Sequence, residues 1–454
     1  MIPYPRTQRR NAGLSCYELQ SAIFNDAAGA SLRALPASLL LLSSLLVYWP
    51  VYFHEFLLAW DDQWVVQNAY TEDGLNFTNL WKIISEFYHG QYAPTNELYY
   101  ALLYWASGYN AVVFHLGSLF LHMCCIILVY SFLLKLLSMS GSFSTRSYQR
   151  IAFFTALLFG IHPFLVESVA WLSASKTIIY SLFYLLALHS WLAYLRRRKW
   201  ASYVATVVLF FISFGGKEQA VVLPCCLLLL DYVTGRSLKE KAVWLEVIPF
   251  FVLAAFFGYV TLLSQAVNGD GVLSHRVGYP VYQNIVFGFY TMTEYFIKCI
   301  LPIRLSYVYP FPNLPNDPLP VRFWIYPFAV IFAGVGLWSV WKQKWIFFGV
   351  AFFLIHIAVA LNFIPTARFA IVADRYVYLA SIGILFLVMY LVDKAVVMGI
   401  KYGRVLSAIG FCYIFGLGIY SHERVKVWHD PDTLKREIRE TIRQRNDYGQ
   451  HSDE

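Results

Sequence analysis

The chain has 454 residues, of which 59% are hydrophobic, 19% are aromatic and only 14% are charged, and its formal net charge is +8. Because about one quarter of the residues of a soluble domain are charged, this composition excludes an ordinary soluble protein and predicts one that crosses a membrane several times. The positive charge does not indicate a nucleic-acid partner, since the basic residues form short clusters between apolar segments, as in cytoplasmic loops.

About 20 apolar residues are needed to cross a bilayer. The first such segment is Leu35–Phe53, and the basic residues before it predict that residues 1–34 are cytoplasmic. Residues 54–110 then form an outer loop of mixed polarity, in which we expect short amphipathic helices that lie on the membrane. The next predicted spans are Ala111–Leu137, Ile151–Val166, Thr177–Leu195, Ala201–Phe214, Ala220–Val233 and Val243–Leu263.

Lys342 and Lys344 follow a further predicted span, Phe323–Trp341, and indicate a cytoplasmic loop. The stretch before this span must then cross the membrane an even number of times. We expect no crossing there, with Val286–Ile300 packed at the outer face. The last predicted spans are Ile346–Phe363, Tyr376–Val392 and Val405–Tyr420.

The predicted fold class is therefore an all-α polytopic membrane protein with about eleven crossings. Residues 35–421 form one transmembrane domain, and the polar tail 422–454 lies outside.

Two adjacent carboxylates, Asp61 and Asp62, directly follow the first predicted span. Carboxylates are costly near a bilayer and persist where they meet ions, substrates or protons. The pair indicates a general base or a site for a metal ion or phosphate. The alternative is a solvated loop that happens to carry two acids.

Further polar residues share the predicted outer face with this pair. Lys and Arg beside acids at one membrane face are typical of a site for an anionic head group. Taken alone, His162 before Pro163 is more typical of a helix-end cap, and Lys217 with Glu218 of a neighbouring pair at a helix end. The common location favours the functional interpretation, and the residues concerned are His162, Glu167, Lys176, Lys217, Glu218, Arg304, Asp374 and Arg375.

Several strings in the same region carry a family resemblance. They include HPFLVESVAW from His162 to Trp171, GKE from Gly216 to Glu218, and ADRYVYL from Ala373 to Leu379. In order, they resemble the membrane region of the transmembrane and tetratricopeptide-repeat O-mannosyltransferases, especially the bacterial relatives, which have the GT-C glycosyltransferase fold. The resemblance runs from about Leu35 to His429.

The resemblance implies an inverting enzyme that moves a mannose-like hexose from a polyprenyl-phosphate donor to a hydroxyl group at the outer membrane face. It places the acidic motif of the first outer loop at Asp61 and Asp62; Asp61 is the first choice for the catalytic base and Asp62 the second. Arg375 and Lys176 would stabilise the leaving phosphate, with Lys217 and His162 as further candidates.

The remaining candidates for the substrate site have supporting roles. Glu167 would orient His162 or a cation, and Glu218 and Asp374 belong to the same substrate-binding set. No metal is obligatory, because Arg and Lys can neutralise a monophosphate, although paired acids could hold a divalent ion.

The relatives continue from a motif like that at Lys426–Asp430 into helical repeats, whereas no 34-residue period follows here. The acceptor is therefore left open between a protein Ser or Thr, a lipid and a glycan. A transporter or flippase of an anionic lipid-linked sugar and a noncatalytic assembly subunit are the alternative functions. The motifs favour the bacterial inner membrane, with the site on the extracytoplasmic side, or the endoplasmic reticulum membrane in a eukaryote.

Overall fold

The computed structural model describes residues 35–267, 278–315, 317–336, 338–363, 370–399 and 403–443. The predicted cytoplasmic segment 1–34 and residues 444–454 of the predicted tail lie outside this part. The described residues form helices and connecting turns, and their only β-type pairings are two isolated bridges, Tyr88–Gln91 and Tyr309–Val372. The all-α prediction is therefore confirmed for the described residues.

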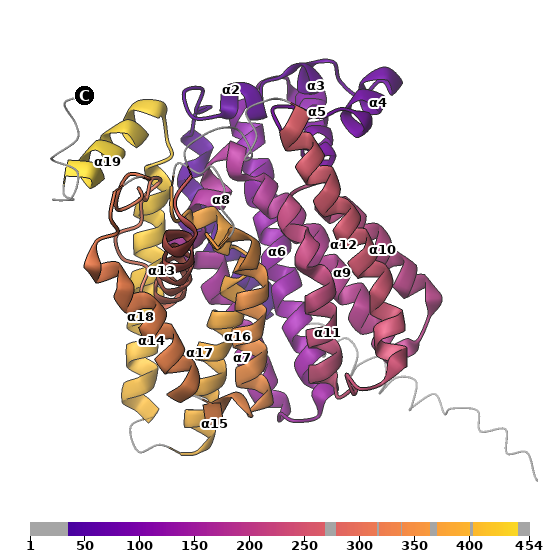
Figure 1. Cartoon of the computed structure of the whole chain (residues 1–454), viewed down its shortest axis with the longest axis vertical. Helices are drawn as coiled ribbons and strands as arrows, with labels where there is room; N and C mark the ends of the chain where they lie inside the picture. Colours follow the sequence, from indigo (N-terminus) through magenta and orange to yellow (C-terminus); the bar gives the residue numbers. More distant parts are fainter. Residues whose placement is uncertain are drawn as a thin grey trace, which may run out of the picture.

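The helices follow one another closely along the chain (Figure 1). The first covers Leu35–Phe53 and ends in the 3-10 turn η1 (Trp49–Phe53). The outer segment holds α2 (Asp62–Val65), α3 (Ala69–Glu72), α4 (Phe77–Ser85) and α5 (Pro94–Ser107). The elements after it are α6 (Ala111–Ser140), α7 (Thr145–Ile161), η2 (Pro163–Leu165), α8 (Val166–Ala170), η3 (Leu172–Ala174), α9 (Lys176–Arg197), α10 (Trp200–Phe214), η4 (Glu218–Val222), α11 (Leu223–Thr234) and α12 (Lys241–Val267).

The second half of the chain is built in the same way. Its elements are α13 (Val281–Ile300), η5 (Val321–Trp324), α14 (Ile325–Gly336), α15 (Trp338–Trp341), α16 (Lys344–Ile357), η6 (Ala358–Ala360), η7 (Asp374–Val377), α17 (Ser381–Val397), α18 (Gly403–Lys426) and α19 (Pro431–Arg443).

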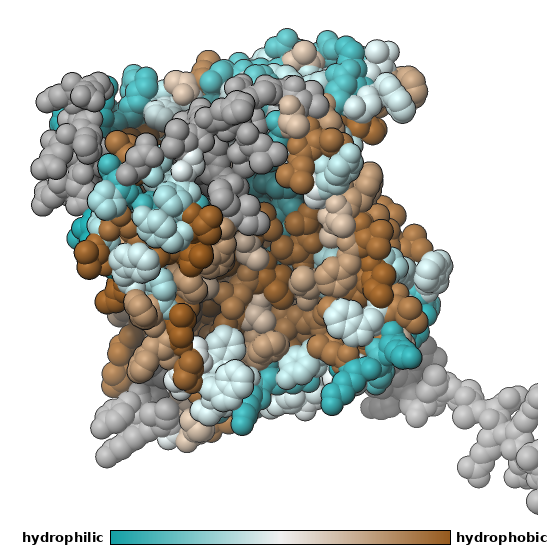
Figure 2. Space-filling view, in the orientation of Figure 1, coloured by the Kyte–Doolittle hydropathy of each residue, from teal (hydrophilic) through white to brown (hydrophobic). Residues whose placement is uncertain are grey.

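Several of these helices are long and apolar enough to cross a membrane. Among the described residues four qualify singly: Leu35–Phe53, α6, the segment Leu172–Arg197 that contains α9, and α12; a bent pair that includes α7 makes up to five. On the face in view, Figure 2 shows a broad hydrophobic region over the body of the molecule and hydrophilic residues over α2–α4 at one end. The protein is therefore membrane-embedded, whereas eleven crossings remain a prediction.

The predicted span Ile151–Val166 is wrong at its end, because the helix breaks at His162. α7 stops at Ile161, and the segment Pro163–Ala170 leaves at an angle of 56°. The physical cause is Pro163, which has no backbone N–H and disfavours helical geometry in the residue before it. The His162 backbone is accordingly extended, with ψ at 126°. The break turns the chain of η2 and α8 away from the axis of α7.

Other helix boundaries also differ from the prediction. α17 begins at Ser381 instead of Tyr376, after the 3-10 turn η7, and α18 continues to Lys426, beyond the predicted span end at Tyr420. α13 is a regular helix that packs against α14 and α17, and it is not among the described helices that qualify as membrane spans. The predicted short helices of the outer loop are present as α2–α5.

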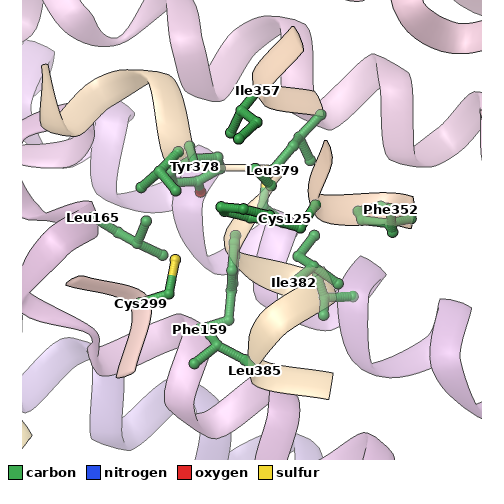
Figure 3. Close-up of a cluster of buried hydrophobic side chains, with 14 of the residues drawn as sticks. Cys125, Phe159, Leu165, Cys299, Phe352, Ile357, Tyr378, Leu379, Ile382 and Leu385 are labelled. Carbon is green, nitrogen blue, oxygen red and sulfur yellow. The ribbon is translucent and has the colours of Figure 1, made fainter. Parts of the chain in front are cut away.

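The core of the bundle lies where α6, α7, α16 and α17 meet. Side chains from these helices and from η2 and α13 converge there (Figure 3), including Cys125, Phe159, Leu165, Cys299 and Phe352. α16 and α17 approach closely because both carry glycine at the contact: a Cβ on Gly383 would lie 2.4 Å from the Gly349 carbonyl oxygen. Small residues at such contacts are typical of helix packing in membranes.

The two ends of α9 give a test of the topology. Gln63 and Glu218 are exposed, and they lie next to or within the lining of the cavity that Lys176 at the start of α9 also lines. Cysteine placed at either position should therefore react with an impermeant thiol reagent from the same side of the membrane. Cysteine at Arg197 should react only from the other side, because the 22 residues of α9 rise about 33 Å. The parent chain sets the background, and labelling of all three positions from one side would contradict the topology.

Candidate functional site

A cavity of about 340 Å³ lies between the outer segment and the turns that precede α9, η4 and α17. Its wall brings together five of the predicted site residues: Asp61, Lys176, Lys217, Glu218 and Arg375. Aromatic rings from distant parts of the chain complete the wall, among them Trp64, Tyr92, Trp171 and Tyr376. The site therefore combines three cations and two acids with apolar faces.

Asp61 faces this cavity because of an unusual backbone conformation. Its φ is 78°, in the left-handed region that residues other than glycine adopt rarely. The half-buried carboxylate accepts one hydrogen bond, from the indole N–H of Trp64, at 3.1 Å between Nε1 and Oδ1. The carboxylate thus has a fixed orientation and acceptor capacity left for a ligand.

Asp62, by contrast, is fully buried and does not line the cavity. Its Oδ2 accepts the Leu57 N–H at 2.8 Å, and its Oδ1 accepts both the N–H of Ser173, at 3.0 Å, and the Ser173 hydroxyl. Burial raises the pKa of Asp62 to about 6, against the opposing effect of these hydrogen bonds. Asp62 ties the outer segment to the turn before α9, so its position indicates a structural role.

Arg375 is held by Glu167, 208 positions earlier in the chain. The guanidinium Nη1 lies 2.7 Å from Oε1 of Glu167, a carboxylate that is only 1% exposed. The guanidinium also lies over the rings of Trp171 and Tyr376, at 5.4 Å and 5.2 Å from their centroids. Burial alone would lower the pKa of Arg375, but Glu167 and the surrounding groups raise it above its ordinary value. This cation is therefore permanently charged and pre-positioned.

The two lysines reach the cavity from different turns. The Lys176 Nζ donates to the Gln91 side chain at 2.8 Å, and the Lys217 Nζ donates to the Thr177 hydroxyl at 3.0 Å. The Lys217 ammonium also lies 4.8 Å from the centroid of the Tyr376 ring, which contacts Arg375 as well. Neither lysine forms an ion pair with another described residue, so both can neutralise a bound anion.

Lys217 is poised to change its charge near neutral pH. Burial lowers the pKa of its ammonium to about 7, Arg375 and Lys176 act in the same direction, and Glu218 opposes them. An anion in the cavity would favour the protonated form. Binding of a phosphate is therefore expected to be linked to protonation of Lys217.

Besides Asp62 and Glu167, three predicted site residues do not line this cavity: His162, Asp374 and Arg304. His162 is buried, with its Nε2 3.1 Å from the Cys299 carbonyl oxygen and its Nδ1 accepting the Phe164 N–H, so both ring nitrogens are used within the fold. Asp374 is buried next to Glu167 and does not line the cavity. Burial and the nearby Glu167 raise the pKa of Asp374 to about 8. His162 and Asp374 do not contact a ligand in this cavity.

Sequence reasoning gave no role to several residues that shape the site. Gln91 accepts a hydrogen bond from Lys176, and the rings of Trp171 and Tyr376 make cation–π contacts with the Arg375 guanidinium. Gly216 also lines the cavity. Its backbone passes so close to α9 that a Cβ at this position would lie 2.9 Å from the Tyr180 backbone nitrogen, which explains the need for glycine. Trp171 and Tyr376 lie within the strings that carry the family resemblance, and this location is the sequence signal that could have marked them as site residues.

No protein-family model matches the chain, and no curated protein matches it. Within the described residues, no group of three or more His, Cys, Asp or Glu side chains is arranged to hold a metal ion.

The different surroundings of the two adjacent acids predict different effects on stability. Asp62→Ala should lower the free energy of unfolding by roughly 2–4 kcal/mol, because the buried N–H groups of Leu57 and Ser173 lose their acceptor. Asp61→Ala should cost less than about 1 kcal/mol, because only one partly exposed hydrogen bond is lost. Thermal unfolding of the purified variants in detergent measures both, and equal losses would contradict the structural role of Asp62.

Proposed function

We propose that this chain is a GT-C-type membrane glycosyltransferase that moves a mannose-like hexose from a polyprenyl-phosphate donor to a hydroxyl acceptor. One observation carries the proposal: a carboxylate with free acceptor capacity, Asp61, faces the same cavity as Lys176, Lys217 and Arg375. A base and a set of phosphate-binding cations on one cavity wall are what an inverting transfer from a lipid phosphate requires. The resemblance of the surrounding strings supports the same reaction.

The cations would bind the donor phosphate and stabilise it as it leaves. When the bond between the anomeric carbon and the phosphate oxygen breaks, the electron pair and its negative charge stay on the phosphate. Arg375 can meet this charge with a planar pair of N–H donors, because Glu167 and the two aromatic rings already fix its guanidinium. Lys176 and Lys217 would add charge at nearby points, and no metal ion is needed for this step.

Asp61 would act as the base. The acceptor hydroxyl oxygen forms a bond to the anomeric carbon on the face opposite the phosphate, and its proton passes to the Asp61 carboxylate. The configuration at the anomeric carbon is inverted. Asp61 is preferred to Asp62, because both oxygens of Asp62 already accept hydrogen bonds from the fold.

The position of the cavity supports an enzyme over a transporter. A transporter usually binds its substrate near the middle of the membrane, whereas this cavity is lined by the outer segment at one end of the bundle (Figure 1). There a polyprenyl chain can remain in the bilayer while its head group and a protein, lipid or glycan acceptor meet at the surface. The enzyme would act on the extracytoplasmic side of a bacterial inner membrane, or in the endoplasmic reticulum of a eukaryote.

The assignment of the base is tested by Asp61→Asn. Loss of a positioned base should lower turnover by about 10²–10⁴-fold, with little change in stability. The measurement is transfer of labelled hexose from polyprenyl-phosphate mannose to acceptors in a membrane extract. Asp73→Asn is a matched control, because Asp73 is an exposed acid of the same outer segment that does not line the cavity. Normal transfer by Asp61→Asn would rule out Asp61 as the base.

The pKa of Lys217 predicts how donor affinity changes with pH. Above about pH 7 the empty site holds Lys217 neutral, so binding of the anionic phosphodiester must take up a proton. The affinity for polyprenyl-phosphate mannose should therefore fall as pH rises, by up to roughly 25-fold from pH 6.5 to 8.5 if the coupling is complete. Lys217→Arg should flatten this profile, because arginine stays charged. An unchanged profile in Lys217→Arg would assign the titration to another group.

A further inference from the structure

A second cavity, of about 460 Å³, lies between the end of α13, the turn after it, and α19. It shares no lining residue with the first cavity. Two basic and three acidic side chains line it, together with tyrosine, serine and threonine residues. The lining residues used below are Glu294, Lys298, Arg304, Glu437 and Glu440.

Most of these charges are balanced within the protein. The Lys298 Nζ lies 3.5 Å from Oε2 of Glu294, and Glu437 accepts a hydrogen bond from Arg424 at 2.9 Å. Arg304 and Glu440 are both exposed, and neither forms an ion pair with another described residue. One cation and one anion thus remain for a ligand that carries both charges.

The Arg304 backbone supports a functional interpretation. Its φ is 54°, one of four positive values outside glycine among the described residues. Such a backbone conformation costs roughly 1–3 kcal/mol, and strained residues of this kind cluster at ligand-binding and active sites. Here the turn brings the side chain to the cavity wall, directly after the apolar end of α13.

The surroundings of the cavity indicate a ligand with an apolar part. Ile297, Leu301 and Ile303 are large, exposed side chains on either side of Lys298 and Arg304 in the sequence. α19 contributes Glu437, Glu440 and Thr441 to the lining, and it packs on the protein through its buried residues Leu434 and Ile438. Figure 1 shows α19 beside the end of the bundle that carries α2. Charged groups in the cavity next to exposed apolar side chains of a membrane-embedded bundle fit a ligand with a polar head and an apolar tail.

We propose that this cavity binds the head group of a zwitterionic phospholipid with a primary amine, such as phosphatidylethanolamine. The phosphodiester would contact Arg304, with Lys298 near it, and the ammonium would contact Glu440. The acyl chains would lie along the exposed apolar side chains at the end of α13. The site is separate from the sugar-transfer cavity, and the proposal does not depend on the glycosyltransferase assignment.

The experiment measures lipid binding to the purified full chain by native mass spectrometry. Phosphatidylethanolamine is compared with phosphatidylglycerol, which lacks the amine, and glycerophosphoethanolamine serves as a water-soluble competitor. The variants are Arg304→Gln and Glu440→Gln. Lys342→Gln and Glu240→Gln are matched controls, because these exposed residues lie in other loops, outside both cavities.

Each variant has a distinct expected result. Arg304→Gln should weaken binding of both lipids by roughly threefold to tenfold, the worth of one partly exposed charge-assisted contact. Glu440→Gln should weaken only phosphatidylethanolamine and so remove the preference for the amine. The proposal is overturned if Glu440→Gln keeps that preference or if Arg304→Gln binds both lipids like the parent chain. Glycerophosphoethanolamine has the same head group without acyl chains. If it displaces the lipid at the same concentration at which the lipid itself binds, the acyl chains contribute nothing, and the proposal is overturned in favour of a soluble ligand.

Discussion

A carboxylate buried in an apolar bundle is stable only when a cation or several donors satisfy it. The cavity lined by Asp61, Lys176 and Lys217 depends on one such interaction, the Glu167–Arg375 pair. Glu167 lies in α8, directly after the chain bends by 56° at the break before Pro163. Arg375 reaches it from the short turn before α17. Because the carboxylate is almost fully buried and the guanidinium is partly exposed, the pair presents a fixed positive charge to the cavity.

The same constraint separates two acids that are neighbours in the chain. Asp62 points into the fold and accepts hydrogen bonds from Leu57 and Ser173, whereas Asp61, in a left-handed conformation, points to the cavity. The buried acid fixes the position of the exposed one. If Asp61 is the base that we propose, it must be held within a small distance of its productive position, and the buried Asp62 supplies this rigidity from outside the cavity.

The sequence predicts the helical class and most helix positions, because runs of apolar residues are a local signal. Charges are rare in such a chain, and four of those that the sequence analysis selected, Asp61, Lys176, Lys217 and Arg375, line one cavity; their role in a reaction remains a prediction. The sequence cannot pair Glu167 with Arg375 or distinguish Asp61 from Asp62, because these outcomes depend on contacts across 208 positions and on which way one backbone turns. Pro163 is a local signal for a break, yet the predicted span ran past it to Val166, and the 56° angle depends on contacts that the sequence does not show.

The segment that follows α18 also helps to position Arg375. The Trp428 ring is buried and stacks on Trp171, with centroids 5.6 Å apart, and the Glu55 N–H donates to the His429 carbonyl oxygen at 2.9 Å. Since Trp171 also lies under Arg375, residues near the end of the described chain support this cation. The aromatic stack and the Glu167 pair both fix the guanidinium. In the reaction that we propose, the cation would then stabilise the leaving phosphate without rearranging, and such preorganisation is the main source of electrostatic catalysis. The residues that provide it come from three segments that are distant in the sequence.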